Sequence, residues 1–123
     1  MSADDDVTSF IRSTFRSVWS LEMMLFLFRN RDRAWARAEL VAALRGSEST
    51  VGHSIELLVS SGLVETDEAG AAQFRPASAD LERLAAVTAE RYARTPDAVR
   101  RQIVQAANSG LTAFADAFRL RKD

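Results

Sequence analysis

The sequence predicts a mainly α-helical, single-domain protein with one small β-hairpin. Apolar residues recur with a helical period of 3.6 through most of the 123 residues. Residues 63–75 instead alternate as strands do, around the turn residues "DEAG". Serine, proline and glycine residues mark most of the expected helix ends.

The first two helices are predicted from their apolar faces. Val7, Phe10, Ile11, Phe15 and Val18 share one helical face, preceded by Asp4, Asp5 and Asp6, whose charge favours a helix N-terminus. Ser20 is expected to cap a second helix, which is apolar on nearly every side from residue 21 to residue 28. Such a helix is expected to lie in the core.

Residues 29–35 interrupt the helical pattern, and Ala34–Trp35 is predicted to form a very short strand. The segment "ARAELVAALRG" predicts a short helix that ends at Gly46, in the left-handed position after the last turn. Ser47 is expected to cap the next helix, which runs to about Ser61. The residues of this helix expected in or beside the core are Val51, Ile55, Leu57, Leu58 and Val59.

The remaining elements follow from strong local signals. Gly62 is expected to stop the helix before the hairpin, and Ser78 to cap the helix after it. Thr95 followed by Pro96 predicts the start of another helix. The triplet "NSG" at 108–110 is expected to break this helix before a last apolar face.

The order helix, helix, turn, helix, hairpin is that of a winged helix-turn-helix. Within it, "SESTVGHSIELLVSSGLVE" resembles the passage from recognition helix to wing in MarR-like regulators. The resemblance covers residues 35–74, about a third of the chain. It implies a winged-helix core at about 20–76, with flanking helices at about 5–18 and 78–120 that look like the dimerising flanks of such proteins.

The resemblance implies a DNA-binding transcriptional regulator that presents the helix 47–61 to the major groove of double-stranded DNA. The residues expected on its reading face are Ser49, Thr50, Gly52, His53 and Glu56. There is no lysine or arginine from residue 47 to residue 73, so cations for the phosphates must come from elsewhere. The candidates are Arg31, Arg33, Arg37, Arg45 and, at the base of the hairpin, Arg75.

The charge of the hairpin favours a different function. Glu65, Asp67 and Glu68 would place negative charge where a wing approaches the DNA backbone. The alternative is therefore a winged-helix module for protein–protein interaction, whose acidic wing docks a basic partner.

Composition argues against several other functions. Without cysteine and with one histidine, no metal site and no cofactor is expected. Catalysis is not expected either, because the chain has no glycine-rich phosphate loop and no spaced catalytic set. The absence of a signal-peptide pattern and of a long apolar stretch predicts a cytoplasmic protein with no membrane partner.

A homodimer is also expected. Aromatic and aliphatic residues from both chain ends supply more apolar surface than one winged-helix core can bury. The residues expected at this two-fold interface are Phe10, Phe15, Leu111, Phe114 and Phe118.

Overall fold

The computed structural model describes the backbone of residues 3–120 and the side chains of residues 5–108. Its elements are helices α1 (Ala3–Thr14), α2 (Val18–Arg29), α3 (Arg37–Leu44), α4 (Glu48–Ser60), α5 (Ala79–Arg94) and α6 (Pro96–Leu120), with strands β1 (Val64–Thr66) and β2 (Ala72–Phe74). The described part of the chain is therefore mainly helical with one small antiparallel sheet, as the sequence predicts. None of its helices is both long enough and apolar enough to cross a membrane.

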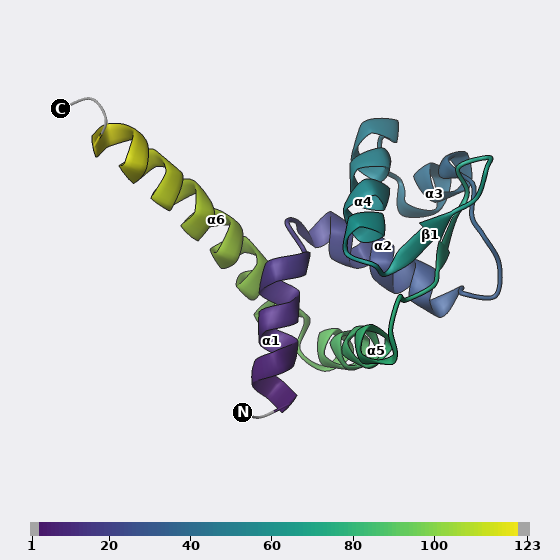
Figure 1. Cartoon of the computed structure of the whole chain (residues 1–123), viewed down its shortest axis with the longest axis horizontal. Coiled ribbons are helices and arrows are strands. Elements are labelled where there is room, and N and C mark those ends of the chain that lie inside the picture. Colours follow the sequence, from purple (N-terminus) through teal and green to yellow (C-terminus); the bar gives the residue numbers. More distant parts are fainter. Residues whose placement is uncertain (1–2, 121–123) are drawn as a thin grey trace.

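Helix α2 runs through the centre of the protein and contacts α4, α5, α6 and β2 (Figure 1). Its core residues are Leu21, Met23, Met24, Leu25 and Leu27, so the apolar surface of this helix is used for packing. The predicted cap at Ser20 is wrong by one turn. Ser17 caps the helix, and the two serines exchange hydrogen bonds, with Ser17 Oγ accepting from Ser20 N at 3.2 Å and Ser20 Oγ accepting from Ser17 N at 3.3 Å.

Helices α3 and α4 pack against each other and are joined by a tight turn. The left-handed residue that ends α3 is Arg45, with φ of 55°, and not Gly46 as predicted. Gly46 is required for a close contact, because a Cβ atom there would lie 2.8 Å from the ring of Trp19. The indole of α2 therefore fixes the position of the turn.

Helix α4 is capped by Ser47, whose hydroxyl accepts from Thr50 N at 3.1 Å, as predicted. Val51, Ile55 and Leu58 are buried in the core. The sequence pattern places Val59 beside them, but this residue is 42% exposed, because it lies on the far side of the helix. The helix stops before Gly62, which has a positive φ of 79°.

The hairpin has the predicted position and turn. β1 and β2 are antiparallel with Val64 opposite Phe74. The carboxylate of Asp67 holds the turn by accepting from the backbone N–H groups of Ala69 (3.0 Å) and Ala71 (2.9 Å). Trp35 exchanges two backbone hydrogen bonds with Ala72, of 2.7 and 2.8 Å, so the strand expected at Ala34–Trp35 is reduced to a single antiparallel bridge at Trp35.

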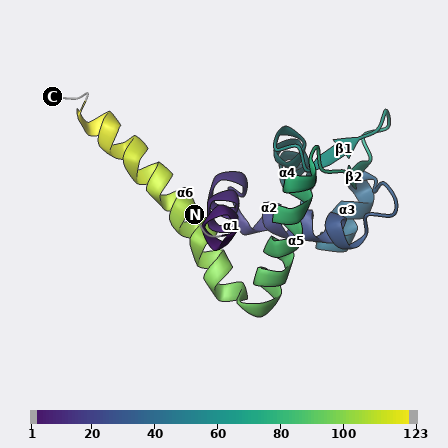
Figure 2. The ribbon, with the colours of Figure 1, turned by 60° about the horizontal axis from the view of Figure 1, so that its bottom comes forward.

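Helices α1, α5 and α6 pack against one another beside α2, and α6 then extends away from the body on the side opposite the hairpin (Figures 1 and 2). Ser78 caps α5 and Pro96 begins α6, as predicted. The predicted break at 108–110 is wrong, since α6 is continuous to Leu120. A glycine costs an α-helix only about 1 kcal/mol, so one unfavourable turn does not end it.

Two of the phenylalanines expected at a dimer interface are in the core instead. Phe10 and Phe15 are 8% and 1% exposed and stack edge to face at 5.7 Å. The packing of α1 against α5 and α6 buries these rings within one chain. Leu111, Phe114 and Phe118 lie outside the residues whose side chains are described.

A polar contact joins α2, α5 and α6. The hydroxyl of Tyr92 donates to Glu22 Oε1 at 2.6 Å and accepts from Arg100 Nε at 3.1 Å. Burial of the ring, followed by the hydrogen bond to the Glu22 carboxylate, raises the pKa of Tyr92. The tyrosine therefore remains a neutral donor between the three helices.

Candidate nucleic-acid interface

The face of α4 turned away from the core carries most of the predicted reading residues. Ser49, His53 and Glu56 are exposed, and His53 Nδ1 lies 4.0 Å from a carboxylate oxygen of Glu56. Thr50 is half-buried, and its hydroxyl accepts a hydrogen bond from Ser47 Oγ at 2.9 Å. These side chains offer hydroxyl, imidazole and carboxylate groups but no permanent positive charge.

Gly52 differs from the prediction because it is buried, and the group that covers it is the guanidinium of Arg37. An ideal Cβ atom built on Gly52 would lie 3.3, 3.4 and 3.6 Å from Nη1, Cζ and Nη2 of Arg37. The guanidinium thus packs tightly against Gly52, and a Cβ atom there would require it to shift by a few tenths of an ångström. A cation from α3 thereby lies on the middle of the α4 face.

Arg37 is also free of competing anions. It is exposed and makes no ion pair with any residue that the structure describes. Arg45, in the turn between α3 and α4, is likewise exposed and unpaired within the described residues. Two of the predicted phosphate-binding arginines are therefore grouped beside the N-terminal half of α4.

Arg31 is held within the protein. It forms an ion pair with Glu82 of α5 and lies over the rings of Phe28 and Phe74, at 5.5 and 4.9 Å from their centres. Its backbone carbonyl also accepts a hydrogen bond from Gln73 at 2.9 Å. Arg31 thus ties the loop after α2 to β2 and α5.

Arg33 is also engaged within the protein, by Glu39 and by the ring of Trp35. Its two terminal nitrogens donate to the two oxygens of Glu39, at 3.2 and 2.8 Å, and its guanidinium lies 3.6 Å from the centre of the Trp35 ring. The hydrogen bond from Arg33, then that from the backbone N–H of Ala36, lowers the pKa of Glu39. Arg33 therefore fixes the start of α3 rather than presenting a free cation.

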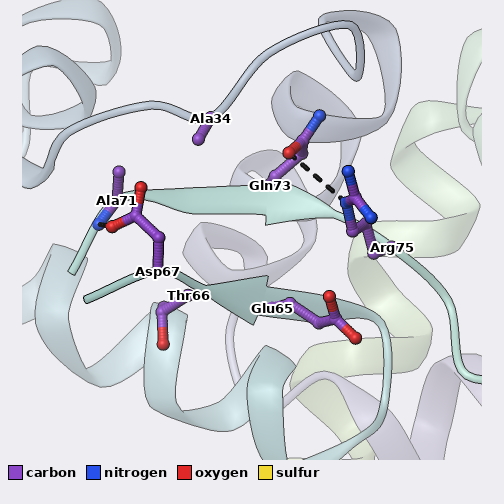
Figure 3. A pocket seen from close by; sticks show the side chains of 7 residues that line it. All are labelled: Ala34, Glu65, Thr66, Asp67, Ala71, Gln73 and Arg75. Carbon is purple, nitrogen blue, oxygen red and sulfur yellow. Dashed lines mark hydrogen bonds between the residues drawn. The ribbon is translucent and has the colours of Figure 1, made fainter. Parts of the chain in front are cut away.

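The hairpin offers a more acidic surface. A cavity of about 260 Å³ lies on it, lined by Ala34, Glu65, Thr66, Asp67, Ala71, Gln73 and Arg75 (Figure 3). Arg75 Nε donates to Gln73 Oε1 at 3.4 Å. Glu65 and Glu68 are exposed and form no ion pair with a described residue, whereas the Asp67 carboxylate is occupied by the turn.

Arg16 is a cation that the sequence pattern did not indicate. It lies in the turn between α1 and α2, yet lines a cleft together with His53 and Glu56 of α4. The two segments are far apart in the sequence, so neither periodicity nor spacing could connect them. Among the described residues, no three side chains of metal-binding type come together.

The chain was compared with protein-family models, curated proteins and solved structures, and none of them matches it. The function must therefore be inferred from the residues and geometry described above.

Proposed function

We propose that the chain is a DNA-binding transcriptional regulator of the winged-helix type, which reads double-stranded DNA with α4. The order of α2, α3, α4 and hairpin supports this proposal, as does the antiparallel bridge that joins Trp35, before α3, to Ala72 of β2. The N-terminus of α4 is the positive end of the helix dipole, and Arg45 lies immediately before it.

The observation that carries the proposal is the position of Arg37 over Gly52. A guanidinium is the group most often used to recognise guanine, and it also binds phosphate through two parallel hydrogen bonds. The α4 segment carries no such group of its own. Arg37 supplies one from α3, with no carboxylate to compete for it among the described residues.

The test is DNA binding measured by fluorescence anisotropy at about 50 mM salt, where phosphate contacts are least screened. Arg37→Gln should weaken binding by about 5- to 100-fold, the range expected for one guanidinium contact of about 1–3 kcal/mol. The matched control is Arg101→Gln, an exposed and unpaired arginine on α6 within the described residues. Failure of the wild-type chain to bind any fragment of genomic DNA would remove the proposal.

We further propose that the regulator acts as a two-fold homodimer through α6. This helix extends beyond the body of the protein, and its last part carries the apolar sequence stripe that includes Leu111 and Phe114. Val104, in the same helix, is 49% exposed. Sedimentation equilibrium at tens of micromolar should give twice the chain mass of 13.6 kDa, and a monomer would contradict the proposal.

A second candidate function is a protein-docking module that uses the hairpin. Glu65 and Glu68 favour it, because two exposed carboxylates without ion pairs can attract a basic surface. The test is the double change Glu65→Lys and Glu68→Lys, which leaves the Asp67 turn intact. On this alternative the variant gains DNA affinity that the wild type lacks, whereas on the first proposal it strengthens binding that already exists.

A further inference from the structure

A cleft of about 310 Å³ lies between the α1–α2 turn and the side of α4. Four of the residues that line it are serines, and one is an arginine. The lining residues are Arg16, Ser17, Ser20, His53, Ser54, Glu56, Leu57 and Ser60. The cleft therefore contains many hydroxyl groups in a small volume.

Ser54 is the unusual member of this set. It is only 5% exposed, and its hydroxyl has no hydrogen-bond partner among the described residues. The hydroxyl oxygen is not one of the fully buried atoms without a partner, so it faces the cleft. Ser20, which is also buried, donates to Ser17 O at 2.7 Å, and Ser61, after α4, donates to Leu57 O at 2.9 Å. The Ser54 hydroxyl therefore remains free to donate to an acceptor bound in the cleft.

The charge of the cleft favours an anion as that acceptor. Arg16 is exposed and has no ion-pair partner among the described residues. Ser17 caps α2, so the positive end of this helix opens at the cleft, and its own hydroxyl proton remains free to donate. The carboxylate of Glu56 would repel a bound anion, and Nδ1 of His53 lies 4.0 Å from one of its oxygens.

We propose that this cleft binds a phosphate group. Phosphate has several acceptor oxygens, which match the guanidinium of Arg16 together with the free hydroxyl donors of Ser17 and Ser54. The group could belong to the DNA backbone beside α4 or to a small phosphorylated compound. The DNA source rests on the proposed function, whereas the second source does not.

The first experiment titrates the whole chain with inorganic phosphate, without DNA and at constant ionic strength, and follows backbone amide shifts. Shifts at residues 16–20 and 53–60 should saturate with a dissociation constant below about 50 mM, which is a weak site by affinity arithmetic. Arg16→Gln and Ser54→Ala should each weaken binding about fivefold or more. Glu56→Gln should strengthen it, because a repelling carboxylate is removed.

Two controls separate binding from folding. Arg12→Gln, an exposed arginine outside the cleft, should bind phosphate as the wild type does. Ser54→Ala should keep the unfolding temperature of the wild type in the absence of phosphate, since the hydroxyl it removes makes no hydrogen bond within the described residues. Absence of saturation, or unchanged phosphate binding in both Arg16→Gln and Ser54→Ala, overturns the proposal.

The second experiment identifies the source of the phosphate group once the site is established. If the bound phosphate belongs to the DNA backbone, Arg16→Gln in phosphate-free buffer should lower DNA affinity for all sequences. It should also reduce the slope of log affinity against log salt concentration by about 0.9. Unchanged DNA affinity, together with loss of inorganic phosphate binding, assigns the cleft to a small phosphorylated compound. The phosphate titration stands even if the chain does not bind DNA.

Discussion

Two pairs of arginines from the same basic stretch end in opposite environments. Arg31 and Arg33 lie over aromatic rings and pair with Glu82 and Glu39, whereas Arg37 and Arg45 are exposed and have no carboxylate partner among the described residues. The first pair joins the loop after α2 to the rest of the fold. The second pair remains available beside α4, with Arg37 at the start of α3 and Arg45 in the α3–α4 turn. The position of a cation therefore decides its role more than the number of cations nearby does.

The largest expected effect comes from neutralising each pair in turn and measuring DNA binding. Arg37→Gln with Arg45→Gln should weaken binding about 10- to 100-fold and lower the salt slope by about two, because each phosphate that is no longer neutralised lowers the slope by about one. Arg31→Gln with Arg33→Gln should change affinity by less than about threefold, because these guanidiniums are engaged within the chain. Equal reductions in both variants, measured by anisotropy over a salt series, would break the distinction.

The next effect isolates the contact between Arg37 and Gly52. Gly52→Ala should shift the guanidinium by a few tenths of an ångström from its present position, since the new methyl group would lie 3.3 Å from Nη1. The same change should stabilise the fold by about 0.5–1 kcal/mol, because alanine favours a helix over glycine. We therefore expect the free energy of unfolding in urea to rise. The DNA affinity should fall about 5- to 10-fold, which corresponds to a loss of about 1 kcal/mol of binding free energy.

The control for this prediction is a double-mutant cycle. In the Arg37→Gln background, Gly52→Ala should cause little further loss of DNA affinity, because the displaced group is already absent. Additive losses would show that the methyl group obstructs DNA directly. In that case Gly52 itself, rather than the cation above it, would be the feature that matters.

The smallest effect concerns the Arg33–Glu39 pair and its pH dependence. Arg33 lowers the pKa of Glu39, so the pair stabilises the fold at pH values above the ordinary pKa of a glutamate. This stabilisation is lost as the pH falls through the lowered pKa of Glu39. Glu39→Gln should lose this part of the stability, and its difference from the wild type should vanish at acidic pH. Unfolding temperatures measured from neutral to acidic pH check the sign, and a difference that grows on acidification would contradict it.

Much of the fold could be predicted because its signals are local. Ser47, Ser78 and Pro96 mark helix starts through contacts within one turn, and Gly62 marks a backbone conformation that other residues avoid. The hairpin was predictable for the same reason, since Asp67 closes its turn within four residues. Contacts between residues within about four positions of each other can be inferred from the sequence alone.

The errors arise where packing between elements decides the outcome. Phe10 and Phe15 are predicted at an interface because the pattern shows an apolar face but not the helices that cover it. Gly52 is predicted at the surface because a helical wheel does not show a side chain arriving from another helix. The cleft beside Ser54 combines the α1–α2 turn with α4, so no spacing rule could have found it.

The contact of Arg37 with Gly52 also constrains how this sequence can evolve. A Cβ atom at position 52 already forces the guanidinium to shift, and a longer side chain there would compete for the space that the guanidinium occupies. Homologous chains should therefore carry the positive charge at one of the two positions, and the residues at 37 and 52 should vary together. Substitution of position 37 alone would leave the face of α4 without the positive charge that α3 supplies.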